Sequence, residues 1–257
     1  MVHDLDDKRL LFATEGREHQ TVEDFAADLK AHGGDPEQVR HVCMDMSAAY
    51  TKGAALALPN AAISYDRFHV VALAIQAMDE VRRQELSAEP EEVAAALAGA
   101  DPKARLNLLW GMRKNPSGWN AAQTDAMHRL QRSTLKSARA WRLRMALREV
   151  YARARQHNSA EQAARDLRSW TSWARRCRLE PFKKLAATIK QRFDAVVRGM
   201  LDHRSNAFVE SMNGQLQQAK RAARGYRTAA NSIAIAYLRL SRLKNLPAHP
   251  FTAAPAK

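Results

Sequence analysis

The sequence has little of what marks secreted, membrane-spanning or fibrous proteins. Its two cysteines, Cys43 and Cys177, are too few for a disulfide framework or a four-cysteine zinc site and suit a reducing cytosol. The longest uncharged stretch, residues 53–65, has thirteen residues, whereas a membrane helix needs about 20 apolar ones. Ten glycines and nine prolines exclude collagen-like and low-complexity chains. The acidic opening MVHDLDDKRL has no apolar core, so we predict an intracellular, soluble protein without a secretory signal.

Negative charge is scarce in the second part of the chain. Residues 1–100 hold nine Lys and Arg against eighteen Asp and Glu, a net charge of −9. Residues 101–257 hold thirty-two against nine, a net charge of +23. This asymmetry favours a polyanionic partner such as nucleic acid for the second part. The alternative is a set of solvated helix faces in a protein from an arginine-rich genome.

Residues 1–66 show the alternation of elements that is typical of an α/β region. Thr21 is the expected N-cap of a first helix that Gly33 and Gly34 end. A helix between two strands favours a parallel sheet with a right-handed crossover. Apolar runs predict strands over residues 9–14, 39–44 and 61–65, and helical spacing predicts helices over residues 21–32 and 48–56.

Residues 67–200 predict helices alone. Asp66 is placed to cap the first of them. On a later helix that starts at Ser159, Trp170 and Trp173 are predicted to pack against other helices, and stacking on nucleic-acid bases is the alternative. Four prolines stand near expected helix starts, namely Pro90, Pro102, Pro116 and Pro181.

Residues 201–257 predict two more helices. Ser205 or Asn206 is the expected cap of the first, and Gly225 is its expected stop. The second spans about residues 229–243, and the Ala- and Pro-rich tail after it is expected to fray.

Three acidic residues are the candidates for chemistry. Asp45 and Asp66 follow apolar strands, where α/β sheets commonly place functional groups, and Glu210 lies on a helix in a basic region. Carboxylates among basic residues suit Mg²⁺ ions that act on phosphodiesters, because this hard cation prefers oxygen ligands. The alternatives are that Asp66 is only a helix cap and that Asp45 is an ordinary loop residue.

Helical steps of three and four extend the pattern from Glu210. They align it with Asn213, Gln217 and then Lys220 or Arg221 along one stripe. Along the helix, this stripe runs from an acid through amides to a base. The order favours metal binding at the Glu210 end of the helix and phosphate binding at the Lys220 end. An ordinary amphipathic helix with a polar face is the alternative.

Three segments together resemble a known family. VCMDMSAAY, PNAAISYDRFHVVALAIQAMDEVRR and HRSNAFVESMNGQLQQAKRAARGYR occur in the order seen in the catalytic domain of bacterial insertion-sequence transposases. They are most similar to the DDE subfamily in which an Asp-Arg-Phe-His motif precedes a large all-helical insertion. The resemblance covers nearly the whole chain. It implies an α/β fold with a ribonuclease H-like core, which cleaves DNA at element ends and joins it to a target.

The resemblance also implies roles for individual residues. Asp45 and Glu210 match the second and the last catalytic acid, and both would be metal ligands. Asp66, His69 and Asn213 would support the site from behind these ligands. The implied cofactor is Mg²⁺ or Mn²⁺, with two ions in an intact site. The implied DNA-binding residues are Arg67, Lys220, Arg221 and Arg224.

One part of the family pattern is not matched. The first catalytic Asp of the family lies on the opening strand of the sheet, which we expect to precede Met1, because residues 1–3 resemble the end of the second strand. Asp4, Asp6 and Asp7 fall in a turn and are poor substitutes. We therefore expect a truncated transposase that is inert as given, or a gene with a misplaced start. The alternative function is a non-catalytic DNA-binding remnant, and a helical RNA-binding protein comes third.

The predicted organisation has four parts. Residues 1–80 form the first part of the core, 81–200 the helical insertion, 201–245 the C-terminal core helices and 246–257 a flexible tail. The expected partner is DNA, as element ends and as target, and self-association is left open. We expect a bacterial cytoplasmic location at the nucleoid and no membrane association.

Overall fold

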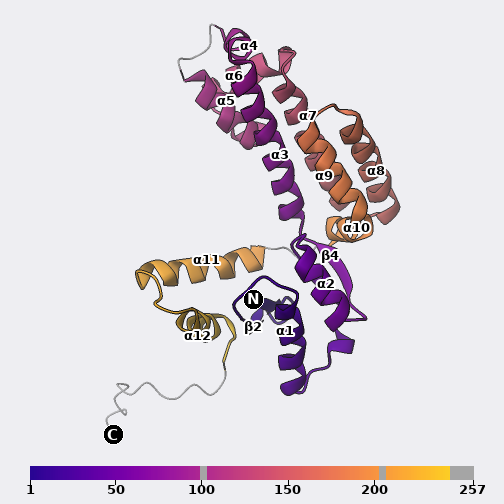
Figure 1. Ribbon diagram of the computed structural model, residues 1–257, viewed down its shortest axis with the longest axis vertical. Helices are drawn as coiled ribbons and strands as arrows, with labels where there is room; N and C mark the ends of the chain where they lie inside the picture. Colours follow the sequence, from indigo (N-terminus) through magenta and orange to yellow (C-terminus); the bar gives the residue numbers. More distant parts are fainter. Residues whose placement is uncertain (99–102, 203–206, 244–257) are drawn as a thin grey trace. The chain divides into compact units, whose positions relative to one another are not determined.

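The computed structural model describes residues 1–98, 103–202 and 207–243 (Figure 1). They fall into two compact units. The mixed unit contains residues 1–40, 47–61 and 207–243, and the helical unit contains residues 41–46 and 62–202. No described helix is both long enough and apolar enough to cross a membrane.

The mixed unit begins with a β-hairpin. Strands β1 (Val2–Asp4) and β2 (Arg9–Phe12) pair antiparallel. The Asp4 carboxylate holds the turn by accepting hydrogen bonds from the backbone N–H groups of Asp6 at 2.9 Å and Asp7 at 3.1 Å. Asp6 and Asp7 are therefore turn residues, as predicted, whereas Asp4 is the last residue of β1.

Helices complete the mixed unit. Gly53 allows helix α2 (Ala48–Ala57) to pack closely against helix α1 (Gln20–Ala31), because a Cβ at position 53 would stand 2.6 Å from the carbonyl oxygen of His19. A small apolar core joins the hairpin to the last two helices through Leu10, Ala13, Met212 and Leu240, among others. These last two helices are α11 (Ala207–Ala222) and α12 (Ala229–Leu240), and a 3-10 turn lies at Pro36–Gln38.

The helical unit contains a parallel pair of strands. Strands β3 (His41–Met44) and β4 (Ala62–Tyr65) run in register, with Cys43 opposite Ser64. This confirms the predicted parallel pairing. Helix α10 (Phe193–Leu201) lies directly against β4, where Arg198 Nε donates a hydrogen bond to the carbonyl oxygen of Ile63 at 2.7 Å.

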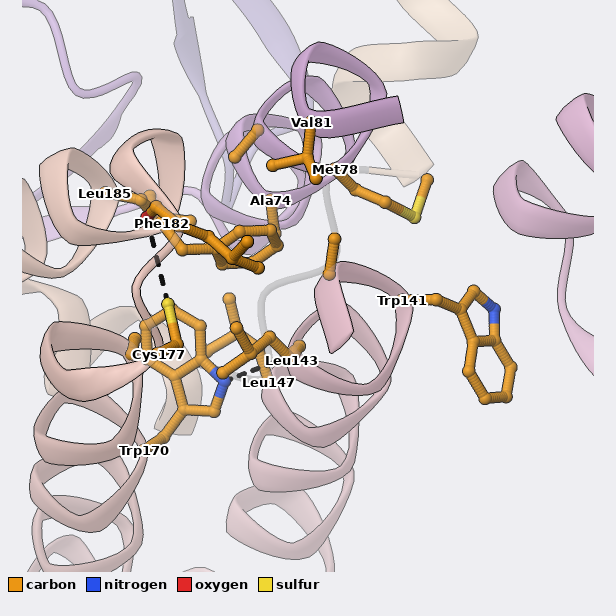
Figure 2. Packing of buried hydrophobic residues seen from close by; sticks show 14 of the residues in the cluster. Ala74, Met78, Val81, Trp141, Leu143, Leu147, Trp170, Cys177, Phe182 and Leu185 are labelled. Atoms are coloured by element: carbon orange, nitrogen blue, oxygen red, sulfur yellow. Dashed lines mark hydrogen bonds between the residues drawn. The ribbon is translucent and has the colours of Figure 1, made fainter. Parts of the chain in front are cut away.

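The other helices of this unit bury its main apolar core. Figure 2 shows Phe182 and Leu185 packed toward Ala74 and Met78. The Trp170 indole lies in the same core and donates a hydrogen bond to the carbonyl oxygen of Leu143 at 2.9 Å. The helices are α3 (Arg67–Ala88), α4 (Pro90–Ala96), α5 (Ala104–Arg113), α6 (Ala121–Arg132), α7 (Lys136–His157), α8 (Ala160–Arg176) and α9 (Glu180–Gln191).

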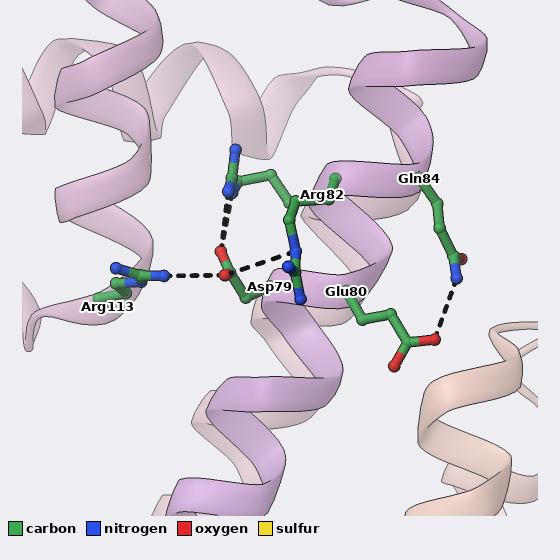
Figure 3. Close-up of polar contacts among 6 residues, drawn as sticks. Asp79, Glu80, Arg82, Gln84 and Arg113 are labelled. Carbon is green, nitrogen blue, oxygen red and sulfur yellow. Dashed lines mark hydrogen bonds and ion pairs between the residues drawn. The ribbon is translucent and has the colours of Figure 1, made fainter.

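Buried polar contacts fix helix α5 against its neighbours. Figure 3 shows the Asp79 carboxylate of α3 between Arg82 and Arg113, with a nitrogen of Arg113 at 2.8 Å. The buried guanidinium of Arg144 on α7 donates hydrogen bonds to carbonyl oxygens of Met112, Arg113 and Lys114, at 2.9, 2.9 and 3.2 Å. These donors satisfy carbonyl groups that the end of a helix leaves without partners.

Most predicted elements are confirmed, and several details were wrong. Thr21 does not cap α1, because the helix starts one residue earlier and His19 occupies the cap position. The strand predicted over 9–14 ends at Phe12, because the N–H of Ala13 donates to the Tyr237 hydroxyl group at 3.0 Å. Trp173 is 43% exposed and does not pack in the core. The predicted caps at 205 and 206, Pro102 and the tail from 246 lie outside the described residues.

Candidate functional site

Asp66 stands where β4 passes into α3. Its N–H continues the strand pairing by donating to the carbonyl oxygen of Met44 at 2.9 Å. One carboxylate oxygen accepts the N–H of Phe68 at 2.9 Å, and the other lies 2.8 Å from Nδ1 of His69. Asp66 is buried, whereas the His69 side chain is 55% exposed. The predicted cap and the predicted contact with His69 are both confirmed.

Asp45 directly follows β3 and lies beside this capped turn. Because Met44 is opposite Tyr65, one further step along the parallel pair places Asp45 opposite Asp66. Asp45 is partly buried. Both acids thus follow the carboxyl ends of neighbouring strands, as the sequence predicts.

A third carboxylate at this sheet was not predicted. Asp202, just after α10, accepts a hydrogen bond from the Ser64 hydroxyl group at 3.4 Å. Burial raises the pKa of the neighbouring Cys43 thiol to about 11; a hydrogen bond with Ser64 acts against this, and the charges of Asp66 and Asp202 add to it. Two carboxylates therefore lie close enough to the strand pair to act on this thiol. The only sequence signal for Asp202 is its place directly before the HRSN motif.

A buried phenol on α7 is close enough to respond to the same charges. Burial raises the pKa of Tyr151, the Asp66 carboxylate raises it further, and Arg67 opposes this. The Tyr151 hydroxyl group has no hydrogen-bond partner among the described residues. Arg67 itself lies over the exposed Phe68 ring, 4.7 Å from its centroid.

Helix α11 carries the predicted polar stripe. Asn213, Gln217, Lys220 and Arg221 are exposed, while the opposite face is buried in the small core of the mixed unit. The backbone of Glu210 belongs to this helix, but its side chain lies outside the described part of the structure.

The basic end of α11 turns sharply. Arg224 and Gly225 have φ angles of 54° and 98°, in the left-handed region. The N–H of Gly225 donates to the carbonyl oxygen of Lys220 at 2.8 Å, so Gly225 ends the helix as predicted. Arg224 is exposed beside this turn.

The structure thus divides the predicted site residues between the units. Asp45, Asp66, Arg67 and His69 lie together in the helical unit. The other candidates belong to the mixed unit, namely Glu210, Asn213, Lys220, Arg221 and Arg224. Among the described side chains, no three His, Cys, Asp or Glu residues form a metal-ligand group.

The comparison with protein families decides the identity. The family model of ISL3-type transposases matches residues 1–236, a span that includes both groups of candidate residues. The chain belongs to this transposase family. This confirms the resemblance to insertion-sequence transposases.

Two curated relatives agree with this assignment. Both are transposases for insertion sequence element IS1557, from Mycobacterium tuberculosis strains CDC 1551 / Oshkosh and ATCC 25618 / H37Rv. Each is 30% identical, over 94% of this transposase chain and 56% of the relative. The chain therefore spans about half the length of the curated relatives that it matches. No solved structure matches it significantly.

Proposed function

We propose that this chain forms the catalytic part of a DDE-type transposase, which cleaves DNA strands at element ends and transfers them to a target. The observation that carries the proposal is the placement of Asp45 at the carboxyl end of β3, in step with the capped turn at Asp66. An antiparallel hairpin followed by a parallel strand pair supports a ribonuclease H-like core. The family assignment supports the activity.

The donor chemistry at Asp45 fits a hard divalent cation. Asp45 supplies carboxylate oxygen, which Mg²⁺ and Mn²⁺ prefer, and Glu210 would supply it from α11. Bound in such a site, two ions would polarise the phosphodiester and stabilise the attacking and leaving oxygens. Asp66 has one hydrogen bond on each oxygen, so its role would be to hold the start of α3 and the His69 ring beside Asp45.

The basic residues would hold the DNA backbone. Lys220, Arg221 and Arg224 are exposed at one end of α11, and Asn213 is exposed nearer Glu210 on the same stripe. Phosphate contacts by Lys and Arg position a protein on DNA without reading its sequence. Arg67 would add a contact at the start of α3. The partners would be element ends and target DNA in the bacterial cytoplasm.

Cleavage in cells tests the proposal. In a transposase reconstructed to the length of its relatives and supplied with a plasmid-borne element, Asp45→Asn and Glu210→Gln should each abolish excision, because the amide keeps the size and loses the charge that the cation requires. Asp125→Asn and Glu161→Gln are matched controls, since both carboxylates are exposed and paired with an arginine on the same helix. Retained excision in either site variant removes that residue from the site.

A second candidate function is DNA binding without cleavage. The net charge of +23 over residues 101–257 favours it independently of the acids. Binding to duplex DNA should then weaken steeply with salt, with a slope of about −0.9 in log affinity per phosphate neutralised. If wild-type protein binds DNA in this way and supports no excision, the second function replaces the first.

A further inference from the structure

Two of the five tryptophans are exposed, and their surroundings differ. Trp170, Trp119 and Trp141 are held inside the helical unit by hydrogen bonds or ring contacts. Trp110 on α5 is 46% exposed and follows the equally exposed Leu106 by one helical turn. Trp173 on α8 is 43% exposed and has arginines around it instead.

The C-terminal half of α8 combines this indole with unopposed positive charge. Residues 167–179 contain four arginines and no Asp or Glu. Arg175 and Arg176 are exposed and form no ion pair with a described residue. The ion pairs of α8 lie in its first half, at Glu161 and Asp166.

Helical geometry places the two kinds of group side by side. Arg176 follows Trp173 by three residues and therefore shares its face of the helix. The opposite face, with Leu167, Trp170 and Ala174, is buried in the core. Trp173 thus lies on a helix with its side chain partly in solvent, and Arg176 follows it on the same face.

Such a pair fits an unpaired nucleotide. An indole face stacks on any base, and arginine binds the phosphate beside it. In an intact duplex the base faces are covered by their neighbours, so stacking requires a base that has left the helix. Nucleic acid is favoured over a protein partner by the net charge of +23 over residues 101–257.

We propose that the C-terminal end of α8 is a contact surface for single-stranded or locally unpaired DNA, on which Trp173 stacks against a base and Arg176 binds a phosphate. The choice of DNA over RNA rests on the proposed function. The surface itself rests on the exposure and charge of α8, and it assigns the helical unit a part in holding DNA strands.

Fluorescence anisotropy with a labelled 20-nucleotide oligothymidine tests the stacking. The full chain is used with EDTA, so that metal-dependent cleavage plays no part. Trp173→Ala should weaken single-strand binding about tenfold, and Trp173→Phe should restore most of it, because one stacked base accounts for a change of this size. Binding to a duplex of the same length should change less than twofold. Thermal unfolding of each variant checks that the fold is intact.

Trp110→Ala is the matched control, since the two indoles are almost equally exposed. An equal loss in both variants would overturn the proposal, as would an unchanged affinity of Trp173→Ala. Equal losses on single strand and duplex would show a general electrostatic surface and would also overturn it. Preference for RNA of the same sequence over DNA would retain the stacking surface and remove DNA as its partner.

The charge is tested separately through salt dependence. Arg176→Gln should reduce the slope of log affinity against log salt by about 0.7, the value for one phosphate of a single strand. Arg129→Gln is the control, because Arg129 is paired with Asp125 at 2.8 Å. An unchanged slope for Arg176→Gln would exclude this arginine from the surface. If the binding tests of α8 fail, the excision test of Asp45 and Glu210 is not affected. If the excision test fails, the binding tests of α8 are not affected.

Discussion

The carboxylate of Glu85 on α3 caps α7, although 52 residues separate it from Ser137. One oxygen accepts the N–H of Ser137 at 2.9 Å and the other accepts the N–H of Lys136. Glu85 is only 2% exposed, so its charge is stabilised by these donors and by the positive end of the helix dipole. A buried acid on α3 thereby fixes the start of α7.

Glu85→Gln should therefore destabilise the helical unit. The amide keeps one accepting oxygen, but its NH₂ group would face a backbone N–H. We expect a loss of about 1–3 kcal/mol in the free energy of unfolding, measured by urea denaturation. Glu80→Gln, which changes a partly exposed acid on the same helix, should cost less than about 0.5 kcal/mol. Equal stability of the two variants would contradict the capping role.

The Asp79 contact predicts a pH dependence. Burial opposes ionisation, but hydrogen bonds and charges from Arg82 and Arg113 outweigh it and lower the pKa of Asp79 below the usual value of 3.8. The contact therefore stabilises the fold above that value, and its contribution is lost as pH falls through the lowered pKa. Asp79→Asn should cost about 1–2 kcal/mol at pH 7, with the difference from wild type shrinking below about pH 4. A difference that stays constant down to pH 2 would contradict the ion pair.

Gly199 allows α10 to lie against β4. A Cβ at this position would stand 2.0 Å from the carbonyl oxygen of Tyr65, and the atom it meets is backbone. Gly199→Ala should therefore destabilise the helical unit by more than about 2 kcal/mol. Gly214→Ala on α11 has open space around it and should stabilise the protein by about 0.5–1 kcal/mol. Thermal unfolding distinguishes the two, and a tolerated Gly199→Ala would show that α10 moves freely.

The reactivity of Cys43 reports the charge at the end of the strand pair. Because the pKa of its thiol is raised to about 11, thiolate is rare at pH 8, and alkylation by iodoacetamide should be about a hundredfold slower than for an ordinary thiol. The rate should climb until about pH 11. Asp202→Asn should lower the pKa and speed the reaction, measured in a Cys177→Ala background. An unchanged rate would show that Asp202 does not contribute to the potential.

The local features of the fold were predictable because their signals lie within a few residues. The cap at Asp66 and the stop at Gly225 are examples, each defined by its own turn. The apolar runs also predicted the parallel pairing of β3 and β4. The ribonuclease H-like core, the metal ligands and the domain boundaries stay predictions.

The contacts between distant segments were not predictable. Glu85 and Arg144 are ordinary charged residues in the sequence, and only packing brings them to the ends of other helices. The same holds for Asp202 beside Ser64. For Trp170 and Trp173, three residues apart on one helix, the apolar pattern predicted burial of both, but the width of the contact with neighbouring helices buries only the first.

The double use of Asp66 affects how genetic data on this family should be interpreted. One of its oxygens caps the strand-to-helix turn and the other holds the His69 ring, so substitutions there damage the scaffold before any chemistry is measured. In a saturation mutagenesis screen, position 66 would score as intolerant and would be mistaken for a catalytic acid. His69 is the informative neighbour, because its half-exposed ring is not required for the turn. If His69 variants reach the same protein abundance in cells but differ in fitness, selection at this position acts on activity.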